Sequence, residues 1–218
     1  FNPLGGFHHA SRNAAEGFCY VNDVLVAIDI FLAKGFKVAY VDIDAHHGNG
    51  VQDAYYEDDR VLTISLHESG KTLYPWTGFE TEIGEDLGKG LNINIPLPEE
   101  IDDESYEYIM DRIVTPAVER FSPTVVVAVV GADTHRSDPL AHLSLTNNGM
   151  VKAVEKLRSY SRHLLMLGGG GYDMQSTTRA WCRMWAAANK IDSLPDYLLV
   201  LGGSFMGGEG VLGADIVD

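Results

Sequence analysis

Hydrophobic residues along the chain follow two alternating patterns, which together predict strands separated by helices. Short, continuous apolar runs rich in β-branched residues are typical of strands buried on both faces. Between these runs, apolar residues recur at the 3.6-residue spacing of amphipathic helices. The predicted strands are 37–43, 61–66, 91–97, 124–130 and 163–167. The predicted helices are 20–34, 51–57, 102–120, one that opens at Thr146, and 175–189. This order indicates an α/β fold with three layers, in which a mostly parallel sheet carries helices on both faces.

The same patterns predict which side chains face the core. Val21 is expected to lie inward in the first helix, Ile113 in the helix 102–120, and Trp185 in the last helix. In the strand 91–97 the apolar residues alternate, which predicts one apolar face. Pro116 is expected to bend its helix or to mark a late boundary, because proline lacks a backbone N–H.

Composition restricts the classes of protein to consider. The 218 residues are 45% hydrophobic and 22% charged, which suits one globular domain over 1–218. The net charge of −15 disfavours direct nucleic-acid binding, which needs a basic face. No run of 18 apolar residues predicts a membrane span. Cys19 and Cys182 are too few for a disulfide framework, and we expect both to be buried and inert. We therefore expect a reducing compartment, the cytoplasm, or the nucleus in a eukaryote. The glycine-rich stretch 202–213 indicates neither a regular element nor a function.

Polar side chains follow the strand 37–43 immediately. Asp42, Asp44 and His46 are spaced two residues apart, so they share one face of an extended chain. Two carboxylates and an imidazole at the carboxyl end of a strand indicate a divalent-metal site, where open α/β sheets bind their ligands. The alternative is that these carboxylates cap the following helix and the histidine lies on the surface.

Two further strands end in polar groups. Asp133 follows the strand 124–130, and Tyr172 follows the strand 163–167 after four glycines. If the sheet is parallel, these ends meet at one edge. An aspartate that joins Asp44 and His46 would give three ligands and one open position, as in catalytic zinc sites. Such a metal polarises a carbonyl and lowers the pKa of its bound water to about 7.

The remaining groups needed for hydrolysis are also present. His8 and His9, on a glycine-flanked loop, are candidates for a general base. The Tyr172 hydroxyl is a candidate donor to a developing oxyanion. Asp42 and Asn49 are candidates to orient the two histidines. The set predicts metal-assisted hydrolysis of an amide.

Five segments of the chain resemble those of one known family. They are 5–10 (GGFHHA), 17–23 (GFCYVND), 42–50 (DIDAHHGNG), 131–133 (GAD) and 168–172 (GGGGY). They occur in the family's order over about residues 2–190. The chain thus resembles the zinc-dependent histone deacetylase superfamily, which includes bacterial acetoin-utilisation proteins and polyamine deacetylases. The implied substrate is an acetylated lysine peptide or protein, or an acetylated polyamine.

The resemblance also implies a role for individual residues. His9 is the expected general base and acid, His8 its electrostatic partner, and Tyr172 the group that polarises the carbonyl. The implied ligands of Zn²⁺, with Fe²⁺ or Co²⁺ as alternatives, are Asp44, His46 and Asp133. The implied substrate-binding residues are Gly17, Phe18, Tyr74 and Gly170. The residues implied for a monovalent ion, expected to be K⁺, are Asp42, Asp44, His46, Ser65 and Leu66.

The chain departs from the family pattern in three places. Asn49 stands where many class I members carry Asp, so a neutral group would orient the histidine and change its pKa. Tyr74 stands where Phe is common, which adds a hydroxyl at the rim of the tunnel. Family members also carry a segment before the position of Phe1, so the catalytic domain is expected to be N-terminally incomplete.

Two other functions compete with a deacetylase. A dimanganese ureohydrolase of the related arginase fold needs further carboxylate ligands, and neither His47-Gly48-Asn49 nor 134–137 supplies them. A binder of acetylated ligands without catalysis would keep the pocket, but the presence of Tyr172 and both loop histidines favours an enzyme. The oligomeric state is not indicated.

Overall fold

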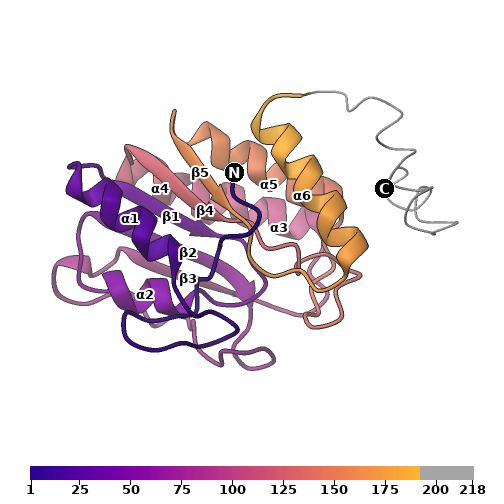
Figure 1. The fold of residues 1–218 in the computed structure, drawn as a ribbon, viewed down its shortest axis with the longest axis horizontal. Helices are drawn as coiled ribbons and strands as arrows, with labels where there is room; N and C mark the ends of the chain where they lie inside the picture. Colours follow the sequence, from indigo (N-terminus) through magenta and orange to yellow (C-terminus); the bar gives the residue numbers. More distant parts are fainter. Residues whose placement is uncertain (192–218) are drawn as a thin grey trace, which may run out of the picture.

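The computed structural model describes residues 1–191, which form a five-stranded sheet with helices on both faces (Figure 1). The strands are β1 (Val38–Asp42), β2 (Val61–Glu68), β3 (Asn92–Leu97), β4 (Val125–Val129) and β5 (Leu164–Leu167). They lie in the order β3-β2-β1-β4-β5, and all neighbouring pairs are parallel. The predicted α/β class is confirmed. The stretch 202–213 lies outside the described residues.

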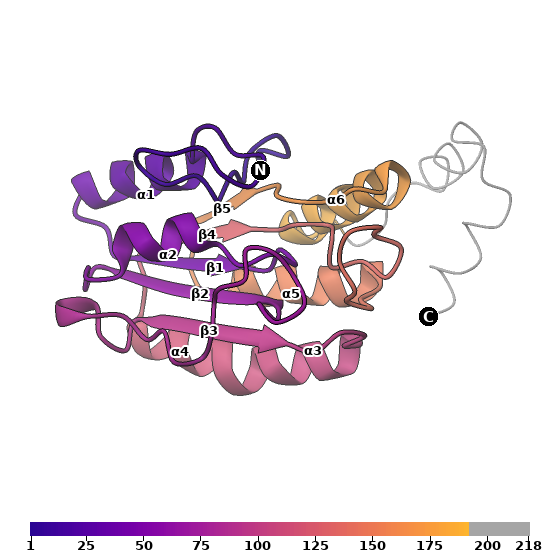
Figure 2. The same ribbon diagram turned by 90° about the horizontal axis from the view of Figure 1, so that it is seen from below.

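Helices cover the sheet in two layers (Figure 2). On one face lie α1 (Asp23–Ala33) and α2 (Asn49–Tyr55). On the other lie α3 (Asp103–Ile109), α4 (Thr115–Phe121), α5 (Asn147–Ser159) and α6 (Met174–Ala188). Each layer encloses its own apolar cluster, so the central strands β1 and β4 are buried on both faces, as their continuous apolar runs predict.

The strand order singles out one point of the sheet edge. From β1 the chain continues outward through β2 to β3, and then returns to β4 on the other side of β1. The carboxyl ends of β1 and β4 therefore diverge in their connections, which makes this the topological switch point where ligands bind in open α/β sheets. In register, Asp42 at the end of β1 lies between Ser65 of β2 and Val129 of β4.

The predicted start of the first helix is wrong by three residues. Asn22 is the N-cap, and its side chain accepts the Leu25 N–H, so the helix begins at Asp23. Val21 precedes this cap and is exposed. The helix predicted over 51–57 lies at Asn49–Tyr55. Strand β2 runs beyond the predicted end to Glu68, and this places His67 in the sheet, fully buried, rather than on a loop.

The helix predicted over 102–120 is interrupted. Asp102 caps α3 through the Ser105 N–H, and a π-helical turn at Met110–Val114 connects α3 to α4. Pro116 lies in the first turn of α4, where its missing N–H removes no bond that the new helix needs. Because a π turn adds a residue, the helical register rotates and Ile113 is exposed rather than inward.

Two further expectations about burial are wrong. In α6 Trp185 is exposed and Met184 is buried, while Trp181 reaches back to donate its indole N–H to the Val130 carbonyl. Cys182, on the same helix, is exposed, whereas Cys19 is buried as expected. No helix among residues 1–191 is long and apolar enough to cross a bilayer.

Strand β3 buries polar as well as apolar side chains. Asn92 and Asn94 are buried and face the Gln52 side chain of α2, whose Oε1 accepts an N–H from each at 2.8 and 2.7 Å. The predicted alternation of apolar residues therefore describes one face of β3. The polar residues Asn92 and Asn94 lie on the opposite face, which is also covered.

Candidate active site

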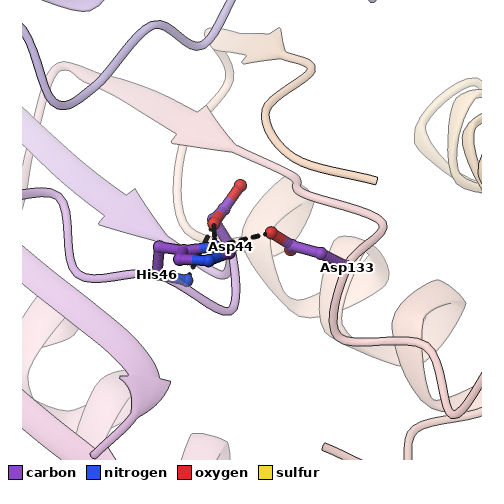
Figure 3. A group of neighbouring side chains, drawn as sticks. All are labelled: Asp44, His46 and Asp133. Carbon is purple, nitrogen blue, oxygen red and sulfur yellow. Dashed lines mark hydrogen bonds and ion pairs between the residues drawn. The ribbon is translucent and has the colours of Figure 1, made fainter. Parts of the chain in front are cut away.

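The proposed metal ligands converge at the switch point (Figure 3). Asp44 and His46 follow β1, and Asp133 follows β4. One ligand atom from each lies within 4.8 Å of the others, and all three residues are buried. The His46 Nδ1 atom is 2.8 Å from Asp133 Oδ2 and 3.2 Å from Asp44 Oδ1. The Asp133 Oδ1 atom also accepts the Ala45 N–H at 2.9 Å, which ties the two strand ends together.

Glycines make room for this convergence. A Cβ atom at Gly131 would overlap the Asp44 carboxylate, and one at Gly170 would overlap that of Asp133. The Gly170 N–H donates to Asp44 Oδ2 at 2.6 Å. Gly170 thus lies against both carboxylates, and its carbonyl accepts the Ala132 N–H at 2.7 Å; its expected role in substrate binding stays a prediction.

The charges in this cluster favour a cation. Burial and then the negative charge of Asp44 raise the pKa of Asp133 to about 7. Burial by itself lowers the pKa of His46. Hydrogen bonds to Asp133 and Asp44, together with their charges, outweigh this effect and raise the pKa to about 11. Two buried carboxylates thus draw a proton onto the imidazole between them. A divalent ion would displace this proton and supply the same charge, so the donor set fits zinc or a similar ion.

His8 and His9 lie beside the cluster, each held by a different partner. His8 Nδ1 is 2.7 Å from Asp42 Oδ2, and His9 Nδ1 is 2.7 Å from Asn49 Oδ1. Their Nε2 atoms are 3.1 Å apart. Both oxygens accept, so each Nδ1 carries a proton. These are the contacts that the orienting role predicted for Asp42 and Asn49 requires, and the role itself stays a prediction.

The two histidines differ in charge. Burial by itself lowers the pKa of His8. The carboxylates of Asp42 and Asp44 outweigh this effect and raise the pKa to about 9. Burial and the adjacent charge of His8 lower the pKa of His9 to about 3, against a smaller rise from the Asn49 hydrogen bond. At neutral pH, His8 is therefore charged and carries a proton on both ring nitrogens, whereas the neutral His9 has its lone pair on Nε2.

Aromatic rings surround the space above the cluster. The Tyr172 ring lies 6.2 Å from that of His46 and 6.4 Å from that of Phe18. The Tyr74 ring meets that of His9 edge-on at 5.1 Å. Gly17 lies against the His9 ring, where a Cβ atom would overlap it. The residues expected to form tunnel walls thus border the same space, and Phe18 is largely exposed to solvent.

Of the residues predicted to bind K⁺, Asp44 and His46 belong to the cluster, while Asp42 lies at the end of β1 and Ser65 and Leu66 lie in the neighbouring β2. Asp42 accepts hydrogen bonds from the Tyr40 hydroxyl and from the Asp44 N–H, the latter at 3.0 Å. Ser65 Oγ bonds His67 Nδ1 at 2.8 Å, and Leu66 is fully buried. The register places these residues together, and a potassium role for them stays a prediction.

Sequence reasoning missed two side chains that touch this site. Asp138 forms a turn, as predicted, by accepting the Leu140 N–H at 2.9 Å, but its second oxygen accepts the Tyr172 N–H at 2.8 Å. Glu16 accepts the Tyr74 hydroxyl at 2.9 Å. The two pairs are 34 and 58 residues apart in the chain, so no local pattern indicates them.

A second group of possible ligands consists of Glu68, Glu99 and His142. The buried Glu68 carboxylate already accepts the Thr72 hydroxyl, the His142 N–H and His142 Nδ1–H, at 2.7–3.0 Å. We interpret it as an anchor for the loop that carries Asp138.

Known proteins are similar to this chain in sequence and in fold. The family model of the histone deacetylase domain matches residues 1–188. Histone deacetylase 1 of Homo sapiens is 44% identical over 187 residues, which are 86% of this chain and 39% of that protein. Histone deacetylase 19 of Arabidopsis thaliana is 42% identical over 199 residues, which are 90% of this chain and 40% of that protein.

Solved structures of histone deacetylase homologs have a similar fold. An HDAC homolog from Aquifex aeolicus superposes with a TM-score of 0.85 at 38% identity, covering 93% of this chain and 56% of that one. An HDAC homolog in complex with SAHA gives a TM-score of 0.85 at 37% identity, with the same coverage. The chain spans about two fifths of the length of the curated relatives it matches. With a family match over residues 1–188, the chain belongs to the histone deacetylase family.

Proposed function

We propose that the protein hydrolyses the amide bond between an acyl group, foremost acetyl, and an amine, foremost the side chain of lysine. One observation carries the proposal: a neutral imidazole, His9, and a phenol, Tyr172, both face the same Asp–His–Asp cluster, with ring distances to His46 of 6.0 and 6.2 Å. This is the set of groups that hydrolysis of an amide requires.

Asp44, His46 and Asp133 would hold the metal ion, with Zn²⁺ as the first candidate and Fe²⁺ or Co²⁺ as alternatives. When bound, such an ion supplies Lewis-acid polarisation of the acyl carbonyl and of the attacking water. The three residues leave further coordination positions for substrate, as in catalytic rather than structural sites.

The protein's own groups move the protons. His9 accepts the proton of the attacking water at Nε2, because its Nδ1 proton is held by Asn49. The same nitrogen then delivers the proton to the leaving amine, which would otherwise depart as a poor amide anion. The charged His8, fixed by Asp42, stabilises negative charge that develops nearby.

Tyr172 donates a hydrogen bond to the oxyanion. Burial and the charges of Asp44 and Asp133 raise the pKa of its hydroxyl, so the group stays protonated across the physiological range and remains a donor. Gly17, Phe18 and Tyr74 border the approach to the site and would line the passage for the acyl-amine chain.

Acetate release tests the proposal. The full-length protein, loaded with Zn²⁺, should release acetate from an acetyl-lysine peptide, detected by proton NMR. A chelator should abolish the release, and added Zn²⁺ should restore it. Asp133→Asn should lose metal and activity together, whereas Tyr172→Phe should keep the metal and lose most activity. The absence of turnover with Zn²⁺, Co²⁺ and Fe²⁺ would contradict an enzyme and favour a binder of acetylated ligands.

Two finer predictions belong to the same proposal. An acetylated polyamine remains the alternative substrate, and a parallel acetate assay with such a compound separates it from a lysine peptide. A bound K⁺ near Asp42 and Ser65 should appear as a dependence of activity on potassium when sodium replaces it at constant ionic strength. A metal content of two divalent ions per chain would revive the ureohydrolase alternative.

A further inference from the structure

The hydroxyl group of Tyr74 is engaged by a charge. It donates to Glu16 Oε1 at 2.9 Å, and the two residues are 58 positions apart. Tyr74 is half-buried beside His9, and Glu16 is exposed. After burial, the main cause that raises the pKa of Tyr74 is its hydrogen bond to Glu16, so the hydroxyl remains a donor to the carboxylate.

The backbone of Glu16 is fixed as well. Its N–H donates to the Cys19 carbonyl at 3.0 Å, and its carbonyl accepts the Cys19 N–H at 2.7 Å. These paired bonds close a tight turn with Gly17 and Phe18 at its tip, both at positive φ, 52° and 65°. Because main chain and side chain are both held, the carboxylate has one defined place at the surface.

That place lies between two walls of the approach to the active site. Gly17, next to Glu16 in the chain, lies against the His9 ring, and Phe18 lies 6.4 Å from the Tyr172 ring. On the other side, the ring of Tyr74 is 5.1 Å from that of His9. The Glu16–Tyr74 bond therefore bridges the rim directly outside the predicted general base.

Neighbouring charges leave this part of the rim negative. The pKa of Asp53 is raised by burial and then by repulsion from Glu82 and Glu16, so these carboxylates act on one another. Arg12, the basic residue on the same loop, is paired with Asp29 at 2.9 Å. A cation that approaches the rim would relieve this repulsion.

We propose that Glu16 is a specificity-determining residue that favours acylated amines with a second positive charge close to the acyl group, and that the Tyr74 hydroxyl fixes its position. The inference rests on the proposed deacylase function. Its chemistry covers a basic side chain beside the acetyl-lysine of a peptide and a free amine of an acetylated polyamine. In both, the acyl chain enters the site while the cation remains at the rim.

The test compares substrates rather than total activity. Two acetyl-lysine peptides differ solely in the flanking residue, Arg or Gln, and the measured quantity is their ratio of kcat/KM in the full-length zinc-loaded protein. Glu16→Gln keeps an acceptor for Tyr74 but removes the charge. We expect it to reduce the preference for the Arg peptide roughly two- to fivefold, through KM, as suits an exposed ion pair. The preference of the wild type should decline between about 50 and 500 mM salt.

Two further variants separate charge from structure. Tyr74→Phe keeps the charge but releases the carboxylate, and should lose part of the preference. Glu155→Gln removes the same charge from an exposed site on α5 and should leave the ratio unchanged. An acetylated polyamine, assayed in parallel, shows which source of the cation is favoured. Equal effects of Glu16→Gln on both peptides, or none, would overturn the proposal.

Failure of the proposed function is distinguishable from failure of this inference. If the wild type hydrolyses neither peptide, the deacylase proposal fails. Affinities of the two peptides for wild type and Glu16→Gln, measured by fluorescence anisotropy, then decide the charge preference alone. A wild type without preference in that assay overturns it.

Discussion

The carboxylate of Asp138 accepts the backbone N–H of Tyr172, with 2.8 Å between Tyr172 N and Asp138 Oδ2. Its other oxygen accepts the N–H groups of Leu140 and Ala141 at 2.9 and 3.3 Å. The preceding Gly169 and Gly171 have φ values of 123° and 143°, which side-chain-bearing residues rarely adopt. Asp138 therefore clamps the end of a conformationally permissive segment, at the residue whose hydroxyl is proposed to meet the oxyanion.

Removal of this clamp should reduce kcat. We expect Asp138→Ala to lower kcat by about 10- to 100-fold with little change in KM or zinc content, because a misplaced donor weakens stabilisation of the transition state. Asp138→Asn, which keeps one acceptor oxygen, should lose less. Steady-state kinetics and metal analysis measure these effects.

A double-mutant cycle provides the control. If Asp138 acts through Tyr172, the variant that combines Asp138→Ala with Tyr172→Phe should be no slower than Tyr172→Phe alone. Additive losses would show that Asp138 has a separate role.

The neutral partner of His9 should govern the acidic limb of the pH profile. Activity requires neutral His9, so kcat/KM falls as the pH falls through its pKa, which burial and then His8 lower to about 3. Asn49→Asp places a negative charge beside Nδ1, stabilises the imidazolium and raises this pKa. The acidic limb should therefore move to higher pH, by about one unit or more. Asn49→Ala should cause no upward shift, and an upward shift there would assign the effect to lost packing rather than to charge.

Space at Gly170 should control metal affinity. Gly170→Ala introduces a Cβ that overlaps the Asp133 carboxylate, so this ligand must move. We expect the affinity for Zn²⁺, measured by competition with a chromophoric chelator, to fall about 10- to 100-fold, the range for disturbed support of metal ligands. The melting temperature of the metal-free protein should change little. Equal affinities of the wild type and Gly170→Ala for Zn²⁺ would refute the placement of Asp133 in the metal site.

The amide of Gln52 should contribute strongly to stability. Its Oε1 accepts bonds from Asn92 and Asn94 and also lies 3.1 Å from His47 Nε2, and its Nε2 donates to Glu82 at 2.7 Å. Gln52→Leu leaves two buried amide donors without this acceptor, so we expect a loss of about 2–5 kcal/mol in the free energy of unfolding. Urea denaturation of the metal-free protein measures it.

The triple variant, in which Asn92→Leu and Asn94→Leu are added to Gln52→Leu, removes these two amide donors as well. It should recover part of the stability, since replacing both partners of a buried bond costs less than removing one. If Gln52→Leu alone left the free energy of unfolding unchanged, the hydrogen bonds of Gln52 would contribute nothing to stability.

Local patterns determined much of this protein. Apolar residues, in continuous runs for strands such as β1 and β4 and alternating in β3, located all five described strands to within a few residues. The spacing of Asp44 and His46 after β1 marked two of the three candidate metal ligands, because it depends on residues close together in the chain. Local spacing misled where an element departed from regular geometry. The π turn before Pro116 rotated Ile113 outward, and the Asn22 cap left Val21 outside the first helix.

Tertiary structure decided which distant residues meet. Parallel strands predicted a shared edge, but the order of strands, with β4 beside β1, brought Asp133 to His46 across 87 positions of the chain. The same holds for Asp138 with Tyr172 and for Glu16 with Tyr74. Periodicity reports the environment of one segment, whereas these contacts depend on how strands are ordered and how loops close over their ends. The choice of partner for each polar group is therefore a property of the packed chain.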